Sequence, residues 1–590
     1  MTATTELRPA PPHPGLAELV RAHAAAAPGR RACVVLDLHG EEDEAVSYGE
    51  LDRRARSTAA ALRRVAEPGE RALLMCDTGL EFVAGFLGCL YSGVIAVPVP
   101  KPDRLSSGPR HWGRIAAICR NAAPSVILTS ADLVDHAEVA GLGVAQRLAV
   151  REVWSGQEAG WTDPFTPTAE PAFLQYTSGS TGDPKGAVIS HGALAANLWA
   201  ITEGFELGGL GPELTTVSWL PLYHDMGIVQ LLLALRNGGT SVLMSQMAFL
   251  VKPLTWLQAV GRYGAQLCSA PNFAFELCVD RIPVQQRAGL DLSRLRNATC
   301  GSEPVRFDTA ERFAAAFEPT GFRGEFFKPA YGLAEGTLYV SGEREPGDPR
   351  YLDVDIAAIT ERGVVAPPAG RGPARRMISN GRVARNLRVR IVDPETGLPC
   401  PPDRVGEIWI AGPSLASGYW RLPEVSAEKF GARPAGAHGA EGPFLRSGDL
   451  GFLRDGQLYV AGRRDDLVIV DGRNHHPRDV EITLTESHPA LAPGQATVFG
   501  HEQDGRLLVV AVAETALGVR VAPPGAEAPA GSTPRTEVER AVRRAVSEEH
   551  QLGIATVVLV KPGAIPRTTS GKLQRRASRQ LYLDGRLNAW

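Results

Sequence analysis

The eleven residues 176–186, Tyr-Thr-Ser-Gly-Ser-Thr-Gly-Asp-Pro-Lys-Gly, constrain this chain more than any other stretch. Seven of them are Gly, Ser or Thr, and they lie between two apolar, strand-like runs at 172–175 and 187–190. Glycines let backbone N–H groups converge on an anion, hydroxyls add donors without bulk, and Lys185 adds a positive charge. The pattern therefore predicts a phosphate-binding loop between two strands. The alternative is a flexible Ser/Gly linker, but linkers are not normally held between strands.

Length and composition limit the class of protein. A chain of 590 residues is too long to fold around a single hydrophobic core, so about two to four structural units are expected. Apolar residues make up 44% and charged residues 22%, which is ordinary for a globular protein. The net charge of −3 lacks the basic excess of nucleic-acid-binding domains, which argues against nucleic acid as a partner.

Cysteines and the N-terminus indicate the compartment. The eight cysteines are scattered without a C-x-x-C pair, which favours buried apolar side chains in a reducing compartment over disulfides or a zinc site. Residues 1–14 are rich in Pro, Thr and Ala, and they are expected to be a disordered tail and not a secretory signal. No apolar run reaches the roughly 18 residues that a membrane helix needs. We therefore expect a cytoplasmic protein with no membrane span.

Apolar strands and amphipathic helices alternate along the first half of the chain. This pattern predicts sheets covered by helices, arranged as two successive α/β layers on either side of the phosphate-binding loop. The expected strands are 72–76, 94–99, 126–129, 216–220 and 240–244, and the expected helices are 79–91, 112–121, 191–203, 227–236 and 254–263.

Two short motifs follow strand-like runs, and a change of composition comes after them. Gly301-Ser302-Glu303-Pro304 and the Tyr-Gly-Leu-Ala-Glu run at 331–335 are expected at the carboxyl ends of strands, where open α/β sheets bind ligands. Residues 342–378 are rich in Pro, Gly, Arg, Asp and Ala, and they keep neither a helical nor a strand period. They are interpreted as a surface insertion.

The last part of the chain divides into a β-rich region and a compact α+β region. Strand-like runs at 387–392, 406–411 and 458–461 predict a small β-rich subdomain. A boundary is expected near 462, followed by helices at 480–486 and 536–549, strands at 495–500, 506–513 and 556–560, and a last helix from Lys572. The predicted division is therefore an N-terminal domain at 15–462 and a C-terminal domain at 463–590.

These motifs, in this order, resemble the adenylate-forming superfamily of acyl-CoA ligases, nonribosomal-peptide adenylation domains, luciferases and fatty acyl-AMP ligases. The resemblance implies that the loop binds the phosphates of ATP, through Thr177, Ser178, Gly179, Ser180, Thr181, Gly182 and Lys185. It assigns the adenine pocket to Gly301, Ser302 and Glu303 with Tyr331 and Gly332, although Ala334 stands where the family usually has Thr. The fold it implies is a large N-terminal domain of two α/β layers plus a β-rich subdomain, with a smaller, mobile α+β domain.

Joining a carboxylate to the α-phosphate of ATP brings two anions together, so cations must offset the charge. Glu335 is the candidate ligand of Mg²⁺, because magnesium prefers hard carboxylate oxygen. Taken alone, Glu335 is better explained as an ordinary acid at a helix start, and its place within Tyr-Gly-Leu-Ala-Glu is what favours the metal ligand. The Ser-Gly-Asp run at 447–449 is more often a turn, but it resembles the ribose motif, with Asp449 accepting from the ribose hydroxyls and Arg463 contacting ribose or phosphate.

Two further residues complete the implied active site. The Pro-Arg-Thr-Thr-Ser-Gly-Lys run at 566–572 resembles the loop whose lysine, here Lys572, bridges the substrate carboxylate and the α-phosphate. The alternative is a solvated lysine beside a basic run. His224 is placed by the resemblance beside the acyl phosphate, although a histidine in such a place is often a packed core residue. Asp465 matches the position about which the C-terminal domain of the family turns.

The narrower likeness is to stand-alone fatty acyl-AMP ligases, carried by residues 219–227, the insertion after Glu335, and residues 471–477. It implies that a fatty acid and ATP give acyl-adenylate and pyrophosphate, and that the acyl group passes to the phosphopantetheine thiol of an acyl carrier protein of a polyketide or nonribosomal-peptide synthase. A fatty acyl-CoA ligase shares every adenylation residue and stays open as an alternative. A catalytically silent nucleotide-binding scaffold is a second alternative. The apolar stretches at 219–222 and 227–235 are candidate walls for the alkyl chain.

Overall fold

The computed structural model describes residues 14–102, 109–156, 158–163, 167–177, 184–344, 347–355, 358–359, 363–368, 374–436, 442–470, 473–503, 506–522, 533–550, 552–568, 573–587 and 589. None of the helices within these ranges is both long enough and apolar enough to cross a bilayer. All eight cysteines are buried and unpaired, as expected for small apolar side chains.

The first layer is a six-stranded sheet with the strand order β6-β5-β3-β4-β7-β8. Five strands run parallel and β8 pairs antiparallel with β7. The elements of this layer are β3 (Arg71–Met75), β4 (Ile95–Pro98), β5 (Val126–Thr129), β6 (Gln146–Ala149), β7 (Pro171–Thr177), β8 (Lys185–Ser190), α2 (Tyr48–Leu62), α3 (Leu80–Ser92), α4 (Pro109–Ala122) and α5 (Ala137–Ala140).

The second layer is the parallel half of a thirteen-stranded sheet, ordered β18-β19-β20-β21-β17-β14-β13-β12-β11-β9-β10-β1-β2. Its apolar core is rich in aromatic rings, including Trp219, Trp256 and Phe275, which are fully buried. The elements of this layer are β9 (Thr215–Ser218), β10 (Thr240–Met244), β11 (Leu267–Ala270), β12 (Asn297–Cys300), β13 (Phe327–Gly332), α6 (His191–Gly204), α7 (Asp225–Arg236), α8 (Gln246–Val251), α9 (Leu254–Arg262), α10 (Asn272–Arg281), α11 (Val284–Arg287) and α12 (Phe307–Phe317).

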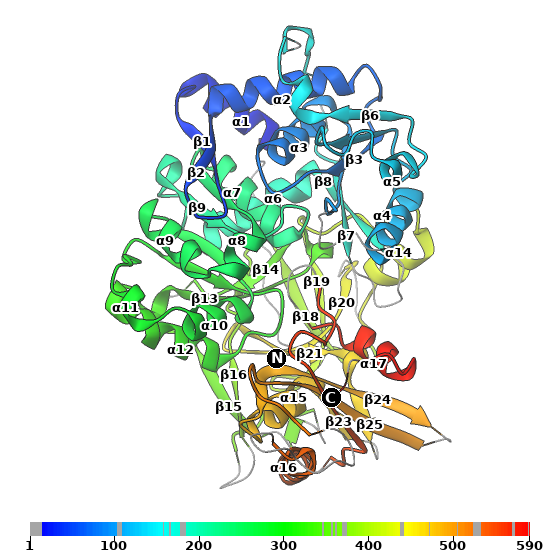
Figure 1. Cartoon of the computed structure of the whole chain (residues 1–590). Helices are drawn as coiled ribbons and strands as arrows, with labels where there is room; N and C mark the ends of the chain where they lie inside the picture. Colours follow the sequence, from blue (N-terminus) through cyan, green and yellow to red (C-terminus); the bar gives the residue numbers. More distant parts are fainter. Residues whose placement is uncertain are drawn as a thin grey trace.

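The β-rich region continues this same sheet by antiparallel pairs, so the small β-rich subdomain shares its backbone hydrogen bonds with the second layer. Its elements are β14 (Tyr339–Gly342), β17 (Arg382–Val383), β18 (Arg388–Val392), β19 (Gly406–Ala411), β20 (Leu445–Arg454), β21 (Gln457–Arg463) and α14 (Pro423–Phe430). At the far edge, β1 (Arg31–Leu36) pairs parallel with β10 and antiparallel with β2 (Glu42–Ser47), close to α1 (Leu16–Ala26). The two motifs at the ends of β13 and within β20 therefore lie on one continuous sheet (Figure 1).

The predicted insertion contains a β-hairpin, which the sequence analysis did not predict. Strand β15 (Tyr351–Asp355) pairs antiparallel with β16 (Ala374–Ile378). Val354 and Met377 are buried in a small cluster with Phe452 and Tyr459. Each strand buries few side chains, so the alternation of apolar and polar residues that marks a strand does not extend far enough to be seen in the sequence.

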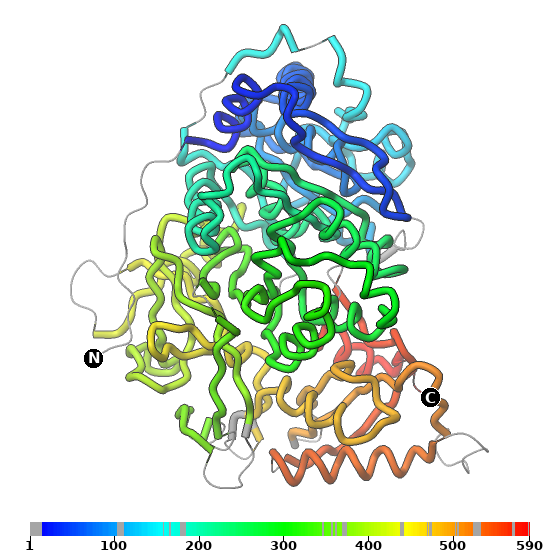
Figure 2. The backbone as a smooth tube through the Cα atoms, turned by 90° about the vertical axis from the view of Figure 1, so that its left-hand side faces the viewer, coloured from blue at the N-terminus to red at the C-terminus, as the bar shows by residue number. Residues whose placement is uncertain are grey.

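A third body follows β21. It has its own three-stranded sheet, β24 (Leu491–Gln503), β25 (Arg506–Thr515) and β26 (Thr556–Val560), and a short hairpin of β22 (Val468–Val470) and β23 (Arg473–His475). Helices α15 (Pro477–Glu486) and α16 (Arg535–His550) pack on this sheet through Val480, Leu484, Val538, Val542 and Val546, and α17 (Arg575–Leu583) follows. This C-terminal body, orange to red, lies below the other layers in Figure 1 and beside the β15–β16 hairpin in Figure 2.

Candidate active site

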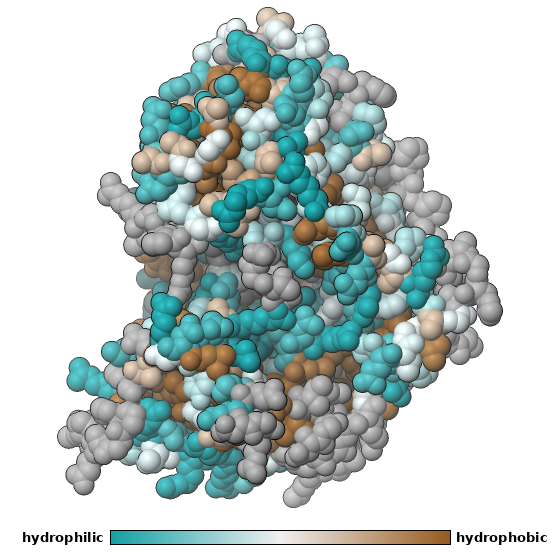
Figure 3. All heavy atoms as spheres, turned by 90° about the vertical axis from the view of Figure 1, so that its right-hand side faces the viewer, coloured by the Kyte–Doolittle hydropathy of each residue, from teal (hydrophilic) through white to brown (hydrophobic). Residues whose placement is uncertain are grey.

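A cavity of about 1240 Å³ lies where the two α/β layers, the β-rich region and the C-terminal body meet. It is lined by every described residue that the sequence assigned to the site: Thr177, Lys185, His224, Gly301, Ser302, Glu303, Tyr331, Gly332, Glu335, Asp449 and Arg463. The remaining predicted residues, Ser178, Gly179, Ser180, Thr181, Gly182 and Lys572, lie outside the described residues. Figure 3 shows hydrophilic side chains gathered across the waist of one face, between the upper layers and the C-terminal body.

The two ends of the predicted phosphate loop are held side by side. Thr177 at the end of β7 pairs with Lys185 at the start of β8, and Tyr176 pairs with Gly186. A Cβ atom on Gly186 would fall 2.8 Å from the ring of Tyr176, so glycine is required there. Thr177 and Lys185 both line the cavity.

A buried carboxylate stands at the predicted ribose motif. Asp449 Oδ2 accepts a hydrogen bond of 2.7 Å from the Tyr331 hydroxyl, and Asp449 Oδ1 lies 3.3 Å from Arg463 Nε. Burial raises the pKa of Asp449, and the Arg463 guanidinium opposes that rise. The Ser-Gly-Asp run, for which a turn was the alternative interpretation, lies within β20, where Asp449 is directly opposite Arg463 of β21. Strand pairing therefore joins the two residues assigned to the ribose.

Glu335 lies in a short 3₁₀ turn after β13, and its partner is a residue that the sequence analysis missed. The Tyr419 hydroxyl donates a 2.6 Å hydrogen bond to Glu335 Oε1 across 84 residues of chain. The ring of Tyr419 also lies 5.7 Å from Lys185 Nζ. Tyr419 thus connects the phosphate-loop lysine to the candidate metal ligand. No motif marks this tyrosine, because the contact is made only in the tertiary fold.

The predicted adenine pocket forms at the carboxyl end of β12. Ser302 has a φ of +72°, a left-handed conformation that turns the chain sharply after Gly301. Glu303 Oε1 accepts a 2.8 Å hydrogen bond from Asn272 Nδ2, and the backbone N–H of Arg306 donates to Asn272 Oδ1 at 2.9 Å. Asn272 therefore fixes the position of the motif, as is expected of open α/β sheets at strand ends.

His224 precedes α7, and its Nδ1 lies 2.6 Å from Asp225 Oδ1. Its side chain is 24% exposed and lines the cavity, so it is not a packed core residue.

Apolar side chains also line the cavity, and they include only part of the stretches proposed as walls for the alkyl chain. Val229 and Leu233 of the stretch 227–235 line the cavity together with Ile201, Phe205 and Leu338. Trp219, Leu220 and Leu222 of the other predicted stretch are buried in the apolar cores instead. Trp219 stacks on Phe249 at 4.2 Å between ring centroids. These three side chains therefore fill the cores of the two α/β layers and do not reach the cavity.

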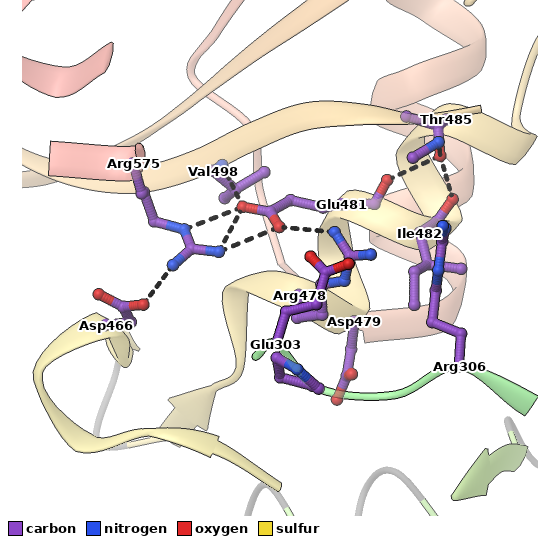
Figure 4. Close-up of polar contacts among 12 residues, drawn as sticks. Glu303, Arg306, Asp466, Arg478, Asp479, Glu481, Ile482, Thr485, Val498 and Arg575 are labelled. Carbon is purple, nitrogen blue, oxygen red and sulfur yellow. Dashed lines mark hydrogen bonds and ion pairs between the residues drawn. The ribbon is translucent and has the colours of Figure 1, made fainter. Parts of the chain in front are cut away.

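The C-terminal body closes the cavity with the residues that flank Lys572. Thr568 and Leu573 line it, and so does Arg575 at the start of α17. Figure 4 shows the guanidinium of Arg575 between Glu481 and Asp466. Arg575 Nε donates to Glu481 Oε1 at 2.9 Å and Arg575 Nη1 donates to Asp466 Oδ2. The pair with Asp466 holds α17 against the segment at 464–466, which contains the predicted pivot Asp465. The pair with Glu481 holds α17 against α15.

Two α/β layers, an antiparallel extension and a separate C-terminal body around one polar-to-apolar cavity define an adenylate-forming enzyme. The comparisons agree. Residues 20–420 match the family described as AMP-binding enzyme, and residues 465–590 match the family described as Disco-interacting protein 2-like, AMP domain. The chain therefore belongs to the AMP-binding enzyme family, and enzymes of this adenylate-forming class use ATP.

Relatives and solved structures extend the similarity over almost the whole chain. The medium-chain-fatty-acid acyl-carrier-protein ligase JamA of Moorena producens is 38% identical over 95% of this chain and 94% of its own length. The long-chain-fatty-acid AMP ligase FadD32 of Mycolicibacterium smegmatis is 35% identical over 94% of this chain and 92% of its own length. A fatty acyl-adenylate ligase of Legionella pneumophila, solved with acyl adenylate and pyrophosphate, has a TM-score of 0.73 at 34% identity and covers 97% of this chain and 96% of its own. The resemblance to fatty acyl-AMP ligases is confirmed.

Proposed function

We propose that this enzyme activates a medium- or long-chain fatty acid with ATP, giving acyl-adenylate and pyrophosphate, and then passes the acyl group to the phosphopantetheine thiol of an acyl carrier protein. The carrier is expected to belong to a polyketide or nonribosomal-peptide synthase. The names of the relatives JamA and FadD32 support the choice of acid and acceptor. A reaction that consumes ATP and a carrier-protein thiol is expected in the cytoplasm.

One observation carries the proposal: the same cavity is lined by the charged side chains of Lys185, Glu335 and Asp449 and by the apolar side chains of Val229 and Leu233. We assign these two groups to a polar end and an apolar end of the cavity. The polar end suits a nucleoside triphosphate, because Lys185 supplies positive charge beside the phosphate loop and Asp449 can accept hydrogen bonds from the ribose hydroxyls. The apolar end suits an alkyl chain. His224 lies between the two ends in our proposal, beside the acyl phosphate.

Glu335 is the proposed ligand of Mg²⁺. Among the described residues, no group of three or more His, Cys, Asp or Glu side chains is arranged so that it could hold a metal ion. A single carboxylate that is completed by substrate phosphates is the donor set that fits, and magnesium is typically held in this way. Tyr419 would orient the carboxylate by the hydrogen bond to its Oε1. Magnesium, when bound there, offsets phosphate charge as the carboxylate of the acid approaches.

The division at 462/463 is proposed to separate a fixed N-terminal domain from a mobile C-terminal domain. Lys572 would bring the movable cation for adenylation, and the domain would turn about Asp465 to admit the thiol. Arg576 Nη2 lies 3.3 Å from Asp465 Oδ2, so α17 contacts this pivot directly. Arg575, which is bonded to both Asp466 and Glu481, would move with α17.

The experiment that tests the proposal offers several fatty acids to the enzyme with ATP and Mg²⁺, and then offers coenzyme A and a holo carrier protein side by side. Isotope exchange between pyrophosphate and ATP reports adenylation, and mass spectrometry identifies the acyl acceptor. We expect acyl-adenylate and acyl-carrier protein. Acyl-CoA formed as fast as adenylate would identify an acyl-CoA ligase. No exchange with any fatty acid would identify a silent nucleotide-binding scaffold.

A further inference from the structure

Lys429 is a partly buried cation that no sequence motif indicates. It lies in the last turn of α14, and its side chain lines the cavity. Its ammonium donates a 3.0 Å hydrogen bond to the backbone carbonyl of Ser447, at the start of the predicted ribose motif. A Cβ atom on Gly448 would lie 3.5 Å from Lys429 Nζ and 3.7 Å from Arg463 Nη2. Lys429 and Arg463 therefore approach the ribose motif together.

The carboxylates around Lys429 already have other partners. Glu335 and Asp449 are the anions that act most strongly on the pKa of Lys429, but Glu335 Oε1 is bonded to Tyr419, and Asp449 is bonded to Tyr331 and Arg463. Glu407, the third acid nearby, pairs with Arg446 at 2.9 Å. Among the described residues, none of these carboxylates lies within ion-pair distance of Lys429 Nζ.

Burial of an ammonium without a direct counter-ion is costly, and it lowers the pKa of Lys429. An ammonium has three donors, and the Ser447 carbonyl uses one of them. The others are left for a group that enters the cavity between Glu335 and Asp449. If Glu335 holds Mg²⁺ and Asp449 holds the ribose, the α-phosphate is the part of the nucleotide that lies between them.

We propose that Lys429 is a nucleotide-binding residue whose ammonium contacts the α-phosphate, both in ATP and in the acyl-adenylate. This inference rests on the proposed function. It differs from the role of Lys572, because α14 belongs to the N-terminal part of the chain. Lys429 would stay with the phosphate when the C-terminal body turns away, so the adenylate would keep a cation during the transfer of its acyl group.

The test compares AMP with adenosine, which differ only by the phosphate. Calorimetry would measure both dissociation constants for the unmodified enzyme, Lys429→Met and the matched control Lys252→Met, which removes an exposed lysine that does not line the cavity. A hydrogen bond to a charged group contributes about 1.5–3 kcal/mol, so Lys429→Met should weaken AMP roughly 10- to 100-fold. Adenosine should change by less than about twofold, and Lys252→Met should change neither ligand.

Melting curves first establish that Lys429→Met is folded, and Lys429→Gln replaces it in the comparison if it is not. In a folded variant, equal weakening of AMP and adenosine, or no change in either, would overturn the inference. An unmodified enzyme that binds AMP no better than adenosine would instead contradict the proposed nucleotide site. A second readout is the release of acyl-adenylate after a single turnover, which Lys429→Met should accelerate and Lys252→Met should leave unchanged.

Discussion

Arg375 Nη1 lies 2.5 Å from Asp479 Oδ1, so an ion pair joins β16 of the insertion to α15 of the C-terminal body. Both side chains are largely buried, with 18% and 9% of their surfaces exposed. His476 is buried beside this pair, and burial lowers the pKa of the imidazole. A buried ion pair between two bodies favours one relative orientation, because breaking it leaves an uncompensated charge.

We predict that this contact suppresses transfer to coenzyme A by holding the C-terminal body in the adenylation orientation. The unmodified enzyme should accumulate acyl-adenylate when coenzyme A is offered. Arg375→Met combined with Asp479→Leu removes both charges and should give measurable acyl-CoA, since a bias of a few kcal/mol suffices to suppress one orientation. Mass spectrometry of the thioester products measures the outcome.

The control for this prediction is Arg376→Met. Arg376 pairs with Asp353 at 3.1 Å inside the β15–β16 hairpin and is 41% exposed, so its loss should not produce acyl-CoA. Acyl-CoA synthesis by the unmodified enzyme at the rate of adenylation would contradict the prediction. Deleting the whole predicted insertion is a poorer test, because residues 342–378 include Gly342 of β14 and the buried Met377 and Ile378.

Lys572→Ala is expected to reduce acyl-adenylate formation by roughly 10²-fold or more, the scale of losing one electrostatic contact in a transition state. Pyrophosphate exchange measures the loss, and melting of the protein should be unchanged. Arg579→Ala is the matched control, because Arg579 is exposed, bonds the Gly500 carbonyl at 3.1 Å and does not line the cavity. Near-normal exchange in Lys572→Ala would reject the role of this lysine.

Preference for the fatty acid should rise with chain length until the apolar end of the cavity is filled. Burying one methylene contributes about 0.8 kcal/mol, so each should improve kcat/KM roughly fourfold. Leu233→Trp narrows the wall formed by α7 and should move the optimum to shorter acids. Leu220→Met, a change in the apolar core, should leave the optimum in place. Equal turnover of acetate and a long-chain acid would contradict this prediction.

Asp449→Asn should weaken ATP binding while stabilising the unliganded protein near neutral pH. Burial raises the pKa of Asp449 above its unfolded value, so the ionised carboxylate reduces stability above the folded pKa, and this penalty disappears as the pH falls through that pKa. The melting temperature of the variant should therefore exceed that of the unmodified enzyme at pH 7, and the two should converge in acid. Arg463 tolerates the change, since 56% of its side chain is exposed.

The KM for ATP should rise roughly 10- to 100-fold in the same variant, because a charged acceptor for the ribose is lost. A lower melting temperature for Asp449→Asn at pH 7 would contradict the assigned cost of burial.

Local patterns predicted much of the fold. The strands at 126–129, 240–244, 406–411 and 556–560 agree residue for residue with β5, β10, β19 and β26. Each is a short apolar run with turn residues at its ends, so both the period and the boundaries are visible in the sequence. The same holds for the phosphate loop, whose flanking strands form the β7–β8 pair.

Other features depend on contacts between distant parts of the chain. No strand was predicted at β20, because Ser447-Gly448-Asp449 has turn composition, and Gly448 does have a φ of +79° inside the strand. Tyr419 and Lys429 reach Glu335 and the Ser447 carbonyl only through the packing of α14 and its preceding loop. Sequence spacing carries no information on such pairs, because neither residue belongs to a motif.

The pairing of β1 with β10 determines when this protein can fold during its synthesis. Thr240 Oγ1 donates to the carbonyl of Arg31, 209 residues earlier in the chain. At the usual rate of about 5–20 residues per second, a ribosome needs roughly 10–40 s to make the intervening segment. During that interval the edge of β1 that pairs with β10, from Cys33 to Leu36, has no partner strand. The nascent chain is therefore expected to need shielding by a chaperone well before its nucleotide site exists.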